Sequence, residues 1–94
     1  MPADKKNPFI REAITWRKTG DEAVILNLET SEYYSANEAG TFVWELFSAG
    51  KKKEKIAAAL AEEYGIPPAQ AEKDTSDFLK ELAKLKIIAP EAVK

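Results

Sequence analysis

The first third of the chain alternates between apolar and polar residues with a period of two. Residues 13–17 place Ile14 and Trp16 on one face and polar side chains on the other, which predicts a half-buried strand. The same alternation predicts a second strand over 23–28 and a short third strand over 32–35. Because only short polar turns separate these segments, we expect an antiparallel meander in which each strand pairs with the next.

Beyond the third strand the spacing of the apolar residues changes to three and four, which is typical of helices. Asn37 is predicted to cap the first helix, because its side-chain oxygen can accept a hydrogen bond from a first-turn amide, and Gly50 is predicted to end it. A second helix is predicted over about 52–64. The third begins at Pro68, a residue suited to the first turn, and ends near Lys86.

Each predicted helix has one apolar side, which we expect to pack on the sheet or on another helix. In the first helix this side consists of Ala39, Phe42, Val43, Leu46 and Phe47. In the second it consists of Ile56, Ala57, Leu60 and Tyr64. In the third it consists of Ala71, Thr75, Phe78, Leu82 and Leu85, with Leu79 beside them. The segment 87–90 is expected to return to the body as a short extended tail.

Three strands followed by three helices predict an α+β fold. A three-stranded antiparallel sheet beside a three-helix cluster is the arrangement of a winged helix-turn-helix, here with the strands first. The 94 residues correspond to one domain. We place this domain at 11–89, with a flexible N-terminal tail over 1–10 and a C-terminal tail over 90–94.

The composition narrows the function classes. The chain has no cysteine and no histidine, which excludes disulfides, thiolate nucleophiles, imidazole bases and the usual structural zinc sites. No nucleophile–base pair or metal cluster can be assembled from the remaining residues, so we expect neither an enzyme nor a cofactor or metal site. No apolar run is long enough to cross a bilayer and the N-terminus lacks a secretory signal, so we expect a cytoplasmic protein without a membrane partner.

The net charge is −2, with lysines and acids interspersed, which argues against a nucleic-acid partner. A DNA-binding winged helix is the alternative function. It is disfavoured because the lysines of the third helix only offset its acids, and this helix would enter the major groove. Those acids are Glu72, Asp74, Asp77 and Glu81. The lysine cluster over 51–55 is interpreted as a solvated helix start rather than a binding patch.

The predicted third strand has no obvious further partner within the chain, so its outer edge is the first candidate for a binding surface. An added peptide strand would satisfy the unpaired backbone groups over Glu32, Tyr33, Tyr34 and Ser35. Two alternatives stay open: the tail at 87–88 covers the edge, or water does, with the strand protected by its shortness and by Glu32. Tyr33 and Tyr34 point to opposite faces, and the pattern does not distinguish which of them is exposed.

The sequence LNLETSEYYSANEAGTFVWEL, residues 26–46, resembles the signature of the PqqD-like proteins, which are named after pyrroloquinoline quinone biosynthesis protein D. Two later fragments extend the resemblance, Ile56-x-x-x-Leu60-x-x-x-Tyr64 and Asp74-x-x-x-Phe78-Leu-x-x-Leu82. The resemblance runs from about residue 11 to about residue 89. One departure is Ser31, which stands where the family has glycine in the second hairpin turn, a position expected to need positive φ.

The resemblance implies a non-catalytic peptide-recognition domain, a chaperone used in making ribosomally synthesised and modified peptides. Such a domain binds the leader of a precursor peptide by strand addition and presents it to a modifying enzyme, often a radical SAM enzyme. In the family the leader pairs with the third strand and lies along the third helix. The candidate peptide-binding residues are Glu32, Tyr33, Tyr34, Ser35, Asp74, Phe78, Glu81 and Leu82. An exposed edge is compatible with both a monomer and a dimer.

Overall fold

The computed structural model describes residues 8–93 of the chain. The sheet contains β1 (Ile14–Thr19), β2 (Glu22–Asn27) and β3 (Glu32–Ala36), antiparallel and in the order β1-β2-β3. The predicted meander is therefore confirmed. Residues 1–7 of the predicted N-terminal tail lie outside the described residues.

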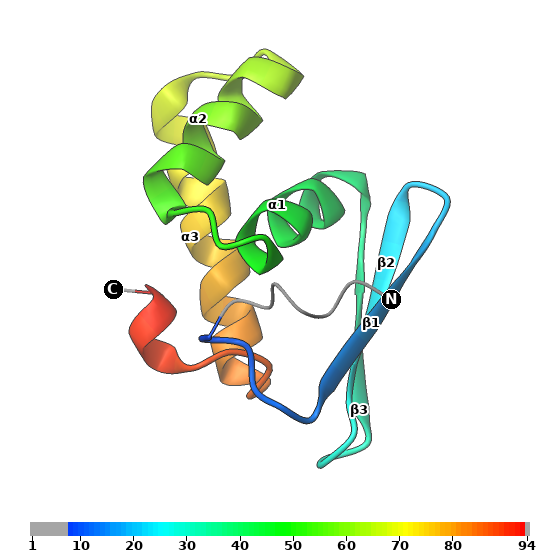
Figure 1. The fold of residues 1–94 in the computed structure, drawn as a ribbon. Helices are drawn as coiled ribbons and strands as arrows, with labels where there is room; N and C mark the ends of the chain where they lie inside the picture. Colours follow the sequence, from blue (N-terminus) through cyan, green and yellow to red (C-terminus); the bar gives the residue numbers. More distant parts are fainter. Residues whose placement is uncertain (1–7, 94) are drawn as a thin grey trace.

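Three helices follow the sheet, α1 (Glu38–Ser48), α2 (Lys53–Tyr64) and α3 (Pro68–Lys84). A short 3-10 helix, η2 (Pro90–Val93), ends the described chain. The helices gather on one side of the sheet (Figure 1). The predicted α+β fold, a small antiparallel sheet followed by three helices, is confirmed.

The helix boundaries follow from local capping signals. The Asn37 side chain accepts a hydrogen bond from the amide of Gly40 at 2.8 Å, which confirms it as the N-cap of α1. Gly65 ends α2 in the left-handed conformation with φ of 62°. Lys52 starts α2 without a side-chain cap, as the lysine-rich sequence there predicts. Pro68 lies in the first turn of α3.

The core lies between the inner face of the sheet and the helices. The inner face of the sheet buries Ile14, Ala23, Ile25, Asn27 and Ala36. The helices bury Val43, Trp44, Phe47, Ile56, Ala57, Leu60, Ala71, Leu79 and Leu82. Trp44 packs edge-to-face against Trp16 of β1, with ring centroids 5.9 Å apart, and so attaches α1 to the sheet.

The predicted apolar sides of α1 and α2 need correction. In α1 the buried side is turned toward Thr41 and Trp44, and Ala39 is exposed. Tyr64 of α2, predicted to be buried, is 36% exposed, with its ring edge-to-face with Phe42. Three- and four-residue spacing marks a broad side of a helix, and tertiary contacts then choose which stripe of that side is covered.

The two ends of the described chain pair with each other and not with β3. Ile10 forms an isolated antiparallel bridge with Ile88, and the amide of Arg11 donates to the carbonyl of Ile87. The alternative in which this tail covers the edge of the third strand is therefore wrong. Ile10 belongs to the core and η2 packs against α3. Packed residues therefore also lie outside the predicted domain of 11–89, at both of its ends.

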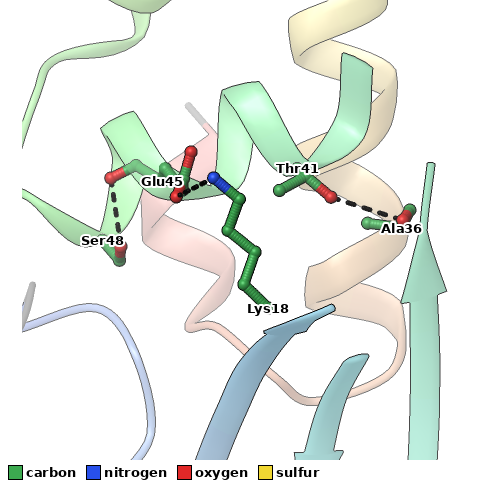
Figure 2. A network of polar contacts seen from close by, with 5 residues as sticks. All are labelled: Lys18, Ala36, Thr41, Glu45 and Ser48. Atoms are coloured by element: carbon green, nitrogen blue, oxygen red, sulfur yellow. Dashed lines mark hydrogen bonds and ion pairs between the residues drawn. The ribbon is translucent and has the colours of Figure 1, made fainter. Parts of the chain in front are cut away.

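Two polar contacts join α1 to β3 and β1, and a third lies within α1 (Figure 2). Thr41 Oγ1 donates to the carbonyl of Ala36 at 3.3 Å, where β3 leads into α1. Lys18 of β1 reaches Glu45 of α1 with 3.1 Å between Nζ and Oε2, and Ser48 Oγ donates to the carbonyl of Glu45 at 3.1 Å. The ion pair is exposed and adds little stability. The buried Thr41 bond fixes the direction in which α1 leaves β3.

Buried Asn27 connects the β2–β3 turn to the end of α3. Its side-chain oxygen accepts hydrogen bonds from the amides of Glu29 at 2.9 Å and Thr30 at 3.3 Å, and Nδ2 donates to the carbonyl of Lys86 at 3.2 Å. These bonds hold the turn in one conformation. Within it, Ser31 has φ of 64°, so the residue that replaces the family glycine does adopt the left-handed conformation.

Replacing Ser31 with glycine should stabilise the domain by about 1 kcal/mol, because glycine adopts positive φ without the steric cost that a Cβ imposes. Thermal melts of the two proteins measure the difference. The same exchange at Ser76, inside α3, is the control and should destabilise the domain by about 0.5 kcal/mol. A Ser31→Gly protein that melts below the parent would contradict the strain assigned to this turn.

Candidate functional site

The outer edge of β3 is open in the part of the chain that the structure describes. β3 pairs with β2 on one side, and the sheet ends at β3. Glu32, Tyr33 and Ser35 are exposed here, and Tyr33 keeps 69% of its surface accessible. The strand therefore presents backbone groups for which residues 8–93 supply no further strand.

The direction of the backbone groups along β2 follows from a bond to the residue before β1. The amide of Leu28 donates to the carbonyl of Ala13 at 2.9 Å, so Leu28 faces β1. Successive residues of an antiparallel strand direct their N–H and C=O groups to opposite sides. Asn27 and Ile25 therefore face β3, and the carbonyl of Asn27 accepts the amide of Ser31 on that side at 2.8 Å.

The strand register carries this alternation across to β3. Tyr34 lies opposite Ile25, so its amide and carbonyl face β2. Its neighbours Tyr33 and Ser35 must then direct their amides and carbonyls away from the sheet. The free edge thus offers donor and acceptor groups at two alternate residues, which is the arrangement that an added strand requires.

A groove lies beside this edge, between β3, α3 and the start of α1, with a volume of about 550 Å³. We call it the β3–α3 groove. The rings of Tyr34 and Phe78 meet in it, with centroids 5.8 Å apart and an interplanar angle of 65°. Further apolar lining comes from Val43, Leu60 and Ile66. Tyr34, and not Tyr33, is the tyrosine that faces the groove.

Gly40 allows α1 to approach the aromatic wall of the groove. A Cβ placed on Gly40 would lie 3.1 Å from Cε1 of Phe78 and 3.3 Å from the Cβ of Ala36, closer than such atoms normally come. A side chain at this position would therefore require its neighbours to move by a few tenths of an ångström. The ring of Phe78 depends on this space for its place against Tyr34.

Carboxylates border the groove along α3. Asp74 and Asp77 line it, and Glu81 lies one turn further along the helix. Burial raises the pKa of the Tyr34 hydroxyl, and the charge of Glu81 raises it further. A hydrogen bond from Lys73 at 2.9 Å lowers the pKa of the Asp77 carboxyl. The groove thus combines an apolar lining with a negatively charged border.

The structure brings most of the predicted site residues together. Asp74, Tyr34, Ser35 and Phe78 line the groove, with Phe78 half-buried, and Glu81 is near enough to act on Tyr34. The remaining edge residues are Glu32 and Tyr33. Leu82 is 0% exposed, so its inclusion among the peptide-binding residues is wrong: its side chain lies on the core side of α3.

Sequence reasoning missed the residues that α1, α2 and the following loop contribute to the groove. Val43, Leu60 and Ile66 carry no distinguishing signal, because apolar residues look alike in sequence whether or not a groove opens beside them. Gly40 did carry one. A glycine inside a helix costs about 1 kcal/mol relative to alanine, so its presence indicates a packing or functional reason.

Among residues 8–93, no group of three or more potential metal-ligating side chains is found together. No helix in this part of the chain combines the length and the apolar character needed to cross a membrane.

Residues 22–88 match the family model described as coenzyme PQQ synthesis protein D (PqqD). The chain belongs to the PqqD family. The matched segment contains β2, β3, the three α-helices and both walls of the groove, and it confirms the resemblance seen in the sequence. No curated protein gives a significant match.

Two solved structures share the fold of this PqqD-family chain. The first, "TbiB1 in Complex with the TbiA(beta) Leader Peptide", is 32% identical and covers 86% of this chain and 94% of that chain, with a TM-score of 0.82. The second, "Lasso peptide synthetase B1 complexed with the leader peptide", is 22% identical and covers 86% and 95% of the two chains, with a TM-score of 0.80. Both relatives therefore have the α+β fold described above, and the second supports the fold alone.

Proposed function

We propose that this chain is a non-catalytic module that binds the leader of a ribosomally made precursor peptide by strand addition and presents it to a modifying enzyme. The observation that carries the proposal is the free edge of β3, where Tyr33 and Ser35 direct backbone groups outward beside the β3–α3 groove. Membership of the PqqD family supports it, as does TbiB1, a relative solved in complex with the TbiA(beta) leader peptide.

Strand addition gives the edge and the groove separate roles. The backbone of the peptide pairs with Tyr33 and Ser35, which supplies affinity with little demand on side-chain identity. Because side chains alternate along a strand, every second residue of the peptide points to the same side as Tyr34, into the groove. The groove then selects among peptides by the side chains that it accepts.

The partners of this module are a precursor leader and the enzyme that modifies the precursor, for which a radical SAM enzyme is the choice that the PqqD-like resemblance implies. We place the complex in the cytoplasm, where ribosomes make the precursor. One chain supplies the strand edge and the lining of the groove, so a monomer suffices for binding, and a dimer is compatible with it.

Amide hydrogen exchange measured by NMR tests strand addition at β3. The probe is a synthetic leader segment of a candidate precursor, which is to be sought as a short open reading frame beside this gene. At saturation the amides of Tyr33 and Ser35 should become protected, whereas that of Tyr34, which faces β2, should be protected before and after. Duplex DNA is the probe for the alternative function, and it should leave the protection of these three amides unchanged. Leader binding without new protection at Tyr33 and Ser35 rejects this edge, and absence of leader binding rejects the proposed function.

Replacing Gly40 with alanine should weaken leader binding about tenfold, because the new methyl group displaces the ring of Phe78 in the groove. The stability should change by less than about 1 kcal/mol, since the higher helix propensity of alanine offsets the strain. Fluorescence anisotropy and thermal melts measure the two effects. The control is Ser76→Ala, on a part of α3 that does not line the groove. Parent-like affinity in Gly40→Ala would show that the close approach does not matter for binding.

A further inference from the structure

Two carboxylates of α3 lie on either side of the aromatic contact in the groove. Asp74 precedes Phe78 by four residues and Glu81 follows it by three, so all three share one side of the helix. At about 1.5 Å per residue, Asp74 is about 6 Å and Glu81 about 4.5 Å from Phe78 along the helix axis. α3 runs in the direction opposite to β3 (Figure 1), and the Tyr34–Phe78 contact fixes where they meet.

The charges of these two carboxylates are not neutralised by ion pairs among residues 8–93. Asp74 accepts a hydrogen bond at 2.9 Å from the neutral side-chain amide of Gln70. Lys73 is paired with Asp77 at 2.9 Å, and its pKa is raised mainly by that hydrogen bond and least by the charge of Asp74. No ion pair of Glu81 is found in this part of the chain. Asp77 is therefore compensated, and Asp74 and Glu81 border the groove with their charges available to a ligand.

Building on the strand addition proposed above, we propose that the leader carries an apolar residue that packs on Tyr34 and Phe78, with lysine or arginine two residues away on one or both sides. Residues two apart on an extended strand point the same way and are about 6.5–7 Å apart. This spacing is close to the distances of Asp74 and Glu81 from Phe78 along the helix axis. The long side chains of lysine and arginine can span the difference between the two spacings.

The spacing also separates favourable leaders from unfavourable ones. Glutamate or aspartate at the same two positions is disfavoured, because like charges would meet at the border of the groove. Basic residues at odd spacings from the apolar residue point to the outer face of the sheet, beside Tyr33, and gain nothing from Asp74 or Glu81. The preference is therefore for a pattern and not for net positive charge.

Selection from a random library of peptides about 12 residues long, displayed on phage, tests this pattern with the full chain. The parent protein should enrich peptides with lysine or arginine two residues from a large apolar residue. The double variant Asp74→Asn, Glu81→Gln should lose that preference. The control double variant, Glu62→Gln with Glu72→Gln, changes the net charge equally at exposed positions outside the groove and should keep it.

The most enriched peptide, labelled with fluorescein, is then titrated against the three proteins at low salt. The Asp74→Asn, Glu81→Gln protein should bind about 3- to 10-fold more weakly than the parent, and the control protein as tightly as the parent. A peptide that protects the Tyr33 and Ser35 amides but shows no such pattern, or equal affinity for all three proteins, overturns the charge preference and leaves strand addition standing. Failure to enrich any peptide that protects these amides overturns the proposed function and this inference with it.

Discussion

Replacing Ser35 with proline should reduce leader binding by at least about tenfold and leave the domain folded. The amide of Ser35 faces away from β2, so the folded domain does not need it for strand pairing. Proline lacks the amide hydrogen that the leader would accept, and its ring occupies the place of the incoming strand. Edge strands tolerate proline where the amide faces outward, so the loss of stability should be small.

Proline at Tyr34 is the matched comparison for stability and should destabilise the fold; because it also removes the ring that lines the groove, its affinity is not compared. The amide of Tyr34 faces Ile25 of β2, and removing it leaves a carbonyl of β2 without its donor, at a cost of about 1–3 kcal/mol. Ser35→Ala keeps the amide and should bind within about twofold of the parent, since backbone pairing makes little demand on the side chain. Anisotropy titrations with the leader segment, run beside thermal melts, separate binding from folding. Parent-like binding by Ser35→Pro would remove β3 as the binding edge.

Local signals account for the parts of the fold that the sequence predicts correctly. Asn37 caps α1 through a bond to an amide three residues away, and Gly65 ends α2 through its own left-handed conformation. Strand alternation at Ile14 and Trp16 is equally local. Each of these features is decided within a few residues, so a pattern over a few residues is enough to find it.

Contacts between distant segments account for what the sequence does not predict. Asn27 looks like an ordinary polar residue of the predicted second strand, yet it is buried and its side-chain amide reaches the carbonyl of Lys86, far along the chain. The pairing of Ile10 with Ile88 likewise joins the two ends of the described chain. Neither contact leaves a periodic trace, so neither can be found by counting apolar positions.

The candidate site shows the same division. The edge of β3 is predictable, because a third strand with no successor must lie at the border of a meander. The sequence does not predict which of Phe78 and Leu82 borders the groove. Residues four apart on a helix share one side, so their spacing does not distinguish them. The structure separates them: Leu82 points into the core, and Phe78 lies against Tyr34.

Phe78→Ala should therefore lose binding with only a modest loss of stability, and Leu82→Ala should lose much stability with little loss of binding. Replacing a fully buried phenylalanine with alanine lowers the free energy of unfolding by about 3–5 kcal/mol. Because Phe78 is only half-buried, its replacement should lower it by about 1–2 kcal/mol. Its loss removes the ring that packs on Tyr34, so leader binding should fall at least about tenfold. Leu82, fully buried, should cost about 2–5 kcal/mol, a large part of the roughly 5–15 kcal/mol typical of a domain.

The two variants must be compared at a temperature at which both are folded, which circular dichroism establishes for each before titration. Folded Leu82→Ala should bind the leader as the parent does, because its side chain does not reach the groove. Urea unfolding gives the stability differences and anisotropy gives the affinities. If Phe78→Ala proves the less stable of the two and binds normally, the ring is a core element and the selective surface lies elsewhere along β3. If Leu82→Ala loses binding while folded, the groove depends on the core side of α3, and the separation between these two residues fails.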